Sequence, residues 1–123
     1  WYVKERMKDS NIVFMDDNID VGIGKFKIQN KVIVFAHGHQ DTINGMFQAM
    51  TGATREFVDY ALLAHYHSEK VKAYQGFKVI VNGSIIGSDS YALSKRLFGK
   101  PSQTLLVFEN GNLSTISIDL DII

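Results

Sequence analysis

Two continuous apolar runs, each followed at once by a histidine pair, constrain this chain more than any other feature. Residues 32–36 (Val-Ile-Val-Phe-Ala) end at His37, and residues 60–64 (Tyr-Ala-Leu-Leu-Ala) end at His65. Uninterrupted apolar runs of this length are typical of strands that are buried on both faces of a parallel sheet. We therefore predict that both runs lie in one sheet, with their carboxyl ends at the same edge.

The rest of the pattern predicts an α/β fold in which strands predominate. Further strands are expected at residues 11–15, 21–28 (with a bulge at Gly24), 77–81, 84–86, 103–108 and 113–120. The last two strands are joined by Glu-Asn-Gly-Asn at residues 109–112, which is a strong hairpin signal. Helices are expected in the exposed segment 1–10, on either side of Thr51-Gly52 within residues 42–60, and at 91–98.

Composition indicates one globular domain spanning residues 1–123. The chain is 46% hydrophobic, and a domain of this size buries roughly two thirds of its unfolded surface. Its 13 basic and 13 acidic side chains give no net charge, which argues against tight non-specific DNA binding. It has no cysteine, so disulfides, thiolate metal sites and cysteine nucleophiles are excluded. We expect a cytoplasmic protein in a bacterial host cell, with no membrane partner, because no apolar run is long enough to span a bilayer.

All four histidines fall in two His-x-His pairs, His37/His39 and His65/His67. Residues two apart on an extended chain project to the same side, so each pair can direct two imidazoles at one point. Neutral imidazole is a common ligand of zinc, manganese, iron and nickel. The pattern predicts a metal site built from at least three of the four. For any one histidine at a strand end, a surface or capping role is the alternative.

Two families with histidine-rich sites match this sequence poorly. A cupin site needs a glutamate at ligand spacing after the histidine pair, and neither pair has one. A metallo-β-lactamase-like hydrolase is a further alternative, because residues 37–41 (His-Gly-His-Gln-Asp) match the first part of that family's H-x-H-x-D-H motif. Thr42 stands where its final histidine belongs, and residues 65–67 do not match its next ligand segment.

The calcineurin-like metallophosphoesterases match better. Their second half contains a histidine that ends an apolar strand, as residues 32–37 do, and later a strand ending in G-H-x-H. Residues 62–67 (Leu-Leu-Ala-His-Tyr-His) resemble that second motif, with Ala64 in place of the glycine. Residues 81–84 (Val-Asn-Gly-Ser) are similar to the family's N-P-G-S turn without its proline, and residues 82–106 resemble the tail of phage-encoded DNA repair exonucleases.

This resemblance implies half of a four-layer α/β/β/α sandwich and a site for two divalent metal ions. Manganese is the first expectation for these ions, with zinc, iron and nickel as alternatives. Carried over motif by motif, His37 and His65 would bind one metal and His67 the other. His39 has no ligand counterpart, so it is the candidate catalytic residue: a contact to the substrate phosphate, a hydrogen-bond partner of a ligand, or a bystander.

The family's carboxylate motifs, D-x-H, G-D-x-x-D and G-N-H-[DE], do not occur in this sequence. The resemblance therefore implies the C-terminal half of a metallophosphoesterase domain, with little activity alone. The expected partner of the intact protein is DNA or a small phosphodiester, with Arg96 and Asn82 as candidate substrate contacts. For Arg96, a solvated charged face is the alternative. A non-catalytic metal-binding or interaction module is the alternative function.

Overall fold

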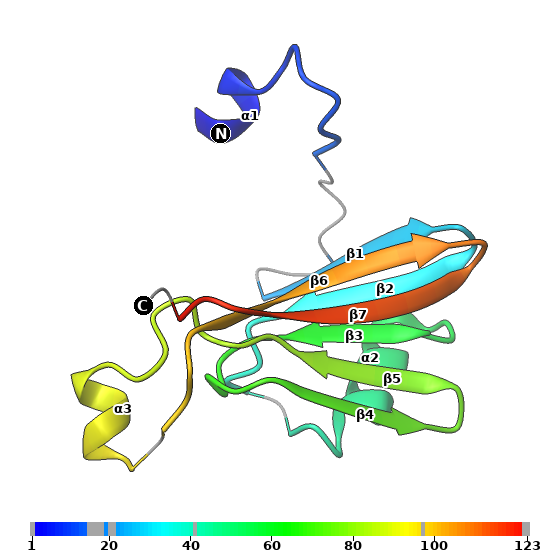
Figure 1. Ribbon diagram of the computed structural model, residues 1–123. Helices are drawn as coiled ribbons and strands as arrows, with labels where there is room; N and C mark the ends of the chain where they lie inside the picture. The colour runs from blue at the N-terminus through cyan, green and yellow to red at the C-terminus, as the bar shows by residue number, and fades with distance from the viewer. Residues whose placement is uncertain (1, 15–18, 20–21, 41, 97, 122–123) are drawn as a thin grey trace.

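A computed structural model of the chain describes residues 2–14, 19, 22–40, 42–96 and 98–121. Its elements in chain order are α1 (Tyr2–Arg6), β1 (Ile23–Ile28), β2 (Lys31–Ala36), α2 (Met46–Thr54), β3 (Tyr60–Leu63), β4 (Lys70–Tyr74), β5 (Phe77–Val81), α3 (Ser90–Ser94), β6 (Ser102–Glu109) and β7 (Asn112–Asp119). Five strands form one mixed sheet in the order β1-β2-β3-β5-β4, and β6 pairs with β7 (Figure 1). The structure is thus mixed α/β with strands predominating, as expected.

The two apolar runs lie in neighbouring parallel strands. β2 pairs with β3 from Ile33↔Tyr60 to Ala36↔Leu63, and β3 pairs in parallel with β5. β1 and β4 are antiparallel and flank this parallel centre. The carboxyl ends of β2 and β3 therefore meet at the same edge of the sheet, which confirms the prediction.

Helix α2 covers one face of the sheet (Figure 1). Its Met46 and Met50 are buried against alternate residues of the central strands, and these residues form the main core together with Val58: Val32, Val34, Ala61, Leu63, Phe77, Val79 and Val81. Full burial of an apolar side chain of this size contributes about 1.5–3 kcal/mol. The continuous apolar runs arise because this face and the opposite one are both covered.

The β6–β7 hairpin covers the opposite face of the sheet (Figure 1). Ile33 and Ile80 point to that face and are almost fully buried. The ring of Tyr60 on β3 lies 5.8 Å from the ring of Phe108 on β6, edge to face. The hairpin turn falls at Asn110-Gly111, as expected. The layers therefore run from α2 through the five-stranded sheet to the hairpin.

Gly24 and Gly52 do not have the structural roles that the sequence predicts for them, a bulge and a break between two helices. β1 pairs with β2 in continuous register without a bulge at Gly24, where an added Cβ would lie 2.0 Å from the Phe35 ring. Gly24 is therefore a site of close packing. Likewise, α2 runs through Gly52 as one helix and not two. An exposed glycine costs only about 1 kcal/mol in a helix, less than the burial of Met46 and Met50 contributes.

The strands expected from the sequence differ from the observed ones where pairing with a distant strand determines the structure. β4 was not expected, because every residue in it is exposed; it forms because the turn at Gln75-Gly76 folds it back onto β5. Residues 84–86 (Ser-Ile-Ile) were expected to form a strand and do not. Residues 11–14 are not a strand either, and residue 15 of that expected strand lies outside the described residues. The expected helix at 91–98 is observed at Ser90–Ser94, with residue 97 undescribed.

Candidate metal centre

The two histidine pairs follow β2 and β3 at the shared edge of the sheet. The pairing of these strands continues one step beyond them, because the Ala64 amide donates to the carbonyl of His37 at 3.2 Å. On the other side of β3, the Asn82 amide donates to the Leu63 carbonyl at 2.8 Å. The backbone that carries the histidines is therefore held from both sides.

Three imidazoles gather at this edge. The ring centroids of His37 and His65 are 5.1 Å apart, those of His37 and His39 are 5.5 Å apart, and those of His39 and His65 are 6.3 Å apart. Nδ1 of His65 lies 3.2 Å from Nε2 of His37. All three side chains are exposed, so the site is open to solvent and to a ligand.

His67 is placed differently from the other three. His65 and His67 both have left-handed backbone, with φ of 58° and 55°, so this segment is not extended. The expectation that His65 and His67 point to the same side is therefore wrong. Among the described residues, His67 makes no ring contact with the other histidines.

The Nδ1 atom of His67 is buried and has no hydrogen-bond partner among the described residues. A buried polar atom without a partner costs about 1–3 kcal/mol, so such atoms are rare unless a ligand or ion satisfies them. The backbone of this residue is also tightly packed, because a Cβ added at Gly99 would lie 2.8 Å from the His67 carbonyl oxygen. His67 is therefore a candidate ligand, because its Nδ1 has no partner among the described residues.

The spacing of the His37 and His65 nitrogens fits a shared metal ion. Two nitrogens that each lie about 2.1 Å from one metal, at an angle of about 90–110°, are about 3.0–3.4 Å apart. The observed separation of 3.2 Å falls in this range, and it also fits a hydrogen bond between the rings. In the part of the chain that the structure describes, no three His, Asp or Glu side chains form a set that could hold a metal. The edge thus offers part of a coordination shell.

The side chain of Asn82 is engaged inside the protein. Its Oδ1 accepts from the Thr104 amide at 2.8 Å, and its Nδ2 donates to Oε1 of Gln103 at 3.1 Å. These bonds tie the end of β5 to the start of the β6–β7 hairpin. A substrate contact by Asn82 stays a prediction, and it would compete with these bonds.

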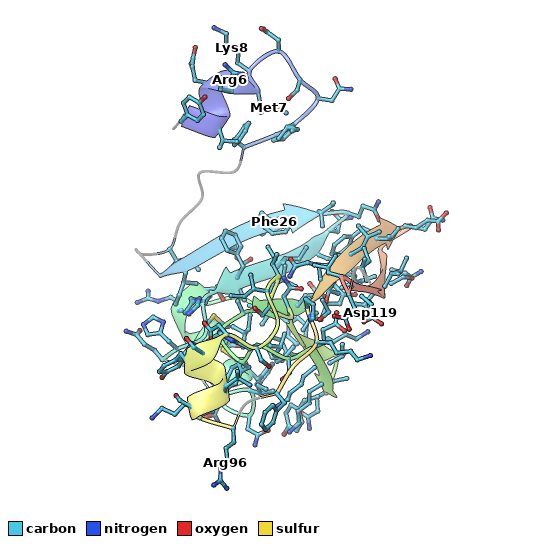
Figure 2. All side chains as sticks on the ribbon, turned by 60° about the vertical axis from the view of Figure 1, so that its left-hand side comes forward. Arg6, Met7, Lys8, Phe26, Arg96 and Asp119 are labelled. Carbon is cyan, nitrogen blue, oxygen red and sulfur yellow. The ribbon has the colours of Figure 1, made fainter. Side chains whose placement is uncertain are left out.

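Arg96 is exposed just after α3, and its side chain points away from the body of the protein (Figure 2). Its backbone amide donates to the Leu93 carbonyl at 3.0 Å. The structure does not bring this guanidinium to the histidines, and its role toward a substrate also stays a prediction. Asp41, part of the lactamase-like match, lies outside the described residues.

Two residues beside the histidines were not singled out from the sequence. The ring of Tyr66 lies 5.6 Å from the His65 ring, and Nζ of Lys70 lies 5.9 Å from the centroid of the Tyr66 ring. The sequence feature that could have identified Tyr66 is its position inside the second His-x-His pair. No sequence feature indicates that Lys70 lies near the histidines, because the sequence pattern does not predict its strand, β4.

The search of family models gives no match to the sequence. The SPbeta prophage-derived uncharacterized protein YonJ of Bacillus subtilis (strain 168) is 28% identical over an alignment of 124 residues that covers 96% of this chain and 30% of that protein. Vps29 of Entamoeba histolytica, solved in complex with Zn²⁺, superposes with a TM-score of 0.59 at 22% identity, over 80% of this chain and 60% of that one.

A conserved uncharacterized protein of Streptococcus pneumoniae TIGR4, described as a predicted phosphoesterase, superposes with a TM-score of 0.60 at 16% identity, over 89% of this chain and 59% of that one. The chain thus spans 30% of the curated relative and about 60% of these two structures. Identities this low bear on the fold alone. The chain therefore has the mixed α/β, metallophosphoesterase-like fold of these structural neighbours.

Proposed function

We propose that this chain supplies the histidine side of a two-metal centre that hydrolyses phosphodiesters. The observation that carries the proposal is the sheet edge, where His37 and His65 bring two ring nitrogens to 3.2 Å and the buried Nδ1 of His67 has no partner among the described residues. Strand carboxyl ends are where α/β sheets bind their ligands. The edge is thus in the expected place for catalysis.

In this proposal His37 and His65 hold one divalent metal ion and His67 contributes to the second. Two such ions, when bound, lower the pKa of a water molecule and stabilise the charge that develops on the phosphoryl oxygens. The protein's part is to fix the imidazoles: parallel pairing fixes His37 beside His65, and the left-handed backbone of His65 and His67 sets the position of His67. Manganese is the first candidate metal. The Zn²⁺ complex of the Entamoeba Vps29 supports a divalent metal in this fold.

His39 is the one histidine with no ligand role in the family pattern. Its ring lies 5.5 Å from that of His37 and 6.3 Å from that of His65, on the exposed side of the edge. From there it can reach a phosphate that bridges the metals. We propose that His39 contacts the substrate phosphate or forms a hydrogen bond with a ligand histidine.

In this proposal the carboxylates that would complete the metal centre come from outside residues 1–123. Each neighbour and the Bacillus relative is longer than this chain, and the three carboxylate motifs of the family are absent from its sequence. We therefore propose that residues 1–123 are the C-terminal half of a metallophosphoesterase domain. The prophage origin of the relative supports a phage-related protein. We propose a DNA exonuclease as the intact protein.

The experiment compares the 1–123 chain with the same chain joined to a polypeptide carrying the three missing motifs. With Mn²⁺, the joined protein should degrade DNA, while the 1–123 chain should cleave bis-p-nitrophenyl phosphate poorly or not at all. His37→Ala, His65→Ala and His67→Ala should each lower turnover by orders of magnitude, because a lost ligand misplaces a metal that activates water and holds the phosphate. The exposed Lys8→Gln serves as the control.

Two outcomes would contradict parts of this proposal. Robust Mn²⁺-dependent cleavage by residues 1–123 alone, abolished by His65→Ala, would show that the half-site account is wrong. Cleavage of small phosphodiesters with no action on DNA would exclude the exonuclease. A joined protein that binds metal and hydrolyses neither substrate would favour a non-catalytic metal-binding module, which the incomplete ligand set also fits.

A further inference from the structure

Two adjoining cavities lie along β4 on the α2 side of the sheet. One has a volume of about 430 Å³ and the other about 600 Å³. Both are lined by Ile43, Asn44 and Lys72, so they form one groove between strand β4 and the segment that leads into α2. We call this the β4 groove.

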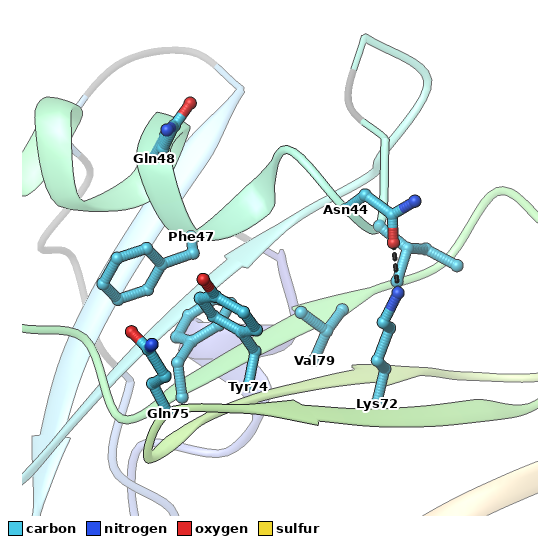
Figure 3. A pocket seen from close by; sticks show the side chains of 9 residues that line it. Asn44, Phe47, Gln48, Lys72, Tyr74, Gln75 and Val79 are labelled. Carbon is cyan, nitrogen blue, oxygen red and sulfur yellow. Dashed lines mark hydrogen bonds between the residues drawn. The ribbon is translucent and has the colours of Figure 1, made fainter.

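One end of the β4 groove is aromatic. The Phe47 ring lies 6.1 Å from the Tyr74 ring and 5.3 Å from the Phe77 ring, both edge to face, and Figure 3 shows Phe47 and Tyr74 side by side at the cavity. Phe77 is buried at the base, while Tyr74 is 55% exposed. A cavity of about 430 Å³ with an exposed aromatic wall matches a planar ring the size of a nucleobase.

The middle of the groove is cationic. Lys72 and Lys70 project from the same strand, and Nζ of Lys72 is hydrogen-bonded to Oδ1 of Asn44 (Figure 3). No aspartate or glutamate is found among the described residues that line either cavity. The groove therefore attracts a polyanion, and Asn44 holds one of the two ammonium groups in place.

The other end of the groove reaches the histidine edge. Tyr66 lines the second cavity, and its ring lies between Nζ of Lys70 at 5.9 Å and the ring of His65 at 5.6 Å. A chain-like ligand in the groove would thus pass from the aromatic end, along the two lysines, to the metal-binding edge.

We propose that the β4 groove binds single-stranded nucleic acid, with backbone phosphates along Lys70 and Lys72 and a base against Tyr74 and Phe47. Cationic grooves with exposed aromatic rings bind single strands in this way, because unpaired bases are free to stack. The proposal rests on the proposed function for its direction: the strand leads to the phosphodiester that the histidine edge would cleave. The binding itself needs no metal.

The test measures binding of the 1–123 chain to a fluorescein-labelled deoxythymidine oligonucleotide of about 12 residues by fluorescence anisotropy in EDTA. Tyr74→Ala should weaken binding at least about ten-fold, because a base loses its stacking surface, and Tyr74→Phe should restore it. Tyr91→Ala, at a tyrosine of α3 that is 65% exposed, is the matched control. Lys72→Gln should lower the slope of log Kd against log salt by about 1, whereas Lys8→Gln should not. Circular dichroism verifies that each variant is folded.

Unchanged affinity in both Tyr74→Ala and Lys72→Gln would overturn the proposal. So would equal competition by polyglutamate, which would show a general polyanion surface, or equal affinity for a duplex of the same length. His65→Ala separates this proposal from the proposed function. It should abolish hydrolysis in the joined protein while binding in EDTA persists, so a failure of catalysis and a failure of the groove give different results.

Discussion

Nδ1 of His65 lies 3.2 Å from Nε2 of His37, although the two residues are 28 positions apart in the chain. Parallel pairing of β2 with β3 causes this meeting, because each histidine follows directly after its apolar strand run. At this distance one ring can donate an N–H to the other, and when that proton sits on the far nitrogen of its own ring, both facing nitrogens can bind one metal ion. The pair is therefore the first place to test for a metal.

Metal binding by the isolated chain should depend on this pair. The 1–123 chain should bind one Zn²⁺ or Mn²⁺ ion weakly, since its ligand set is incomplete. His65→Ala should lower the affinity at least about ten-fold, because one of the two closest donors is lost. Isothermal titration calorimetry measures the change. His39→Ala is the comparison, and an equal loss in both variants would argue against the assigned ligands.

Asn82→Ala should destabilise the fold. It removes two hydrogen bonds between the end of β5 and the start of β6, including one from the Thr104 amide, and we expect a loss of about 1–3 kcal/mol in the free energy of unfolding. Urea unfolding provides the measurement, with the exposed Asn11→Ala as control. Full stability with reduced hydrolysis in the joined protein would instead show a direct role in substrate binding.

Two glycine substitutions should act in opposite directions. Gly87 has φ of 66°, and an added Cβ would lie 2.9 Å from the backbone of Gly99 and Pro101, so Gly87→Ala should destabilise by about 1–3 kcal/mol. Gly52 is exposed within α2, and an added Cβ meets nothing within 4 Å. Gly52→Ala should therefore stabilise by about 0.5–1 kcal/mol. Thermal unfolding compares both variants, and a destabilised Gly52→Ala would contradict the single continuous helix.

Glu56 makes stability depend on pH in the acid range. Hydrogen bonds from Lys25 and Lys27, at 2.6 and 3.0 Å, lower the pKa of this carboxyl below its ordinary value of 4.5. A lowered pKa in the folded state means that the stabilisation is complete above pH 4.5 and is lost as pH falls through the lower value. Urea unfolding between neutral pH and about pH 3 should show a smaller fall in stability for Glu56→Gln than for the wild type. Equal falls would show that the lysines do not hold the charged form.

The meeting of His37 and His65 could be predicted from the apolar strands that they follow. The placement of His67, in the loop after β3, could not. Residues 32–36 and 60–64 are apolar at every position, and a parallel pair that is covered on both faces buries most of such runs, although Phe35 stays 39% exposed. That local pattern determined the fold class and brought His37 beside His65. The placement of His67 depends on left-handed backbone at His65 and His67, which no residue type there predicts.

The β4 groove is a product of tertiary structure alone. Every residue of β4 is exposed, so hydrophobic burial does not hold this strand in place, and it exists because the turn at residues 75–76 places it on β5. Lys70, Lys72 and Tyr74 meet Asn44 and Phe47 only through that pairing. The apolar runs of the sequence indicate which strands form the core, because hydrophobic burial follows local composition. Strand order and turn geometry decide which exposed side chains lie together. Contacts between residues that are distant in the chain cannot be predicted from the spacing of apolar residues along it.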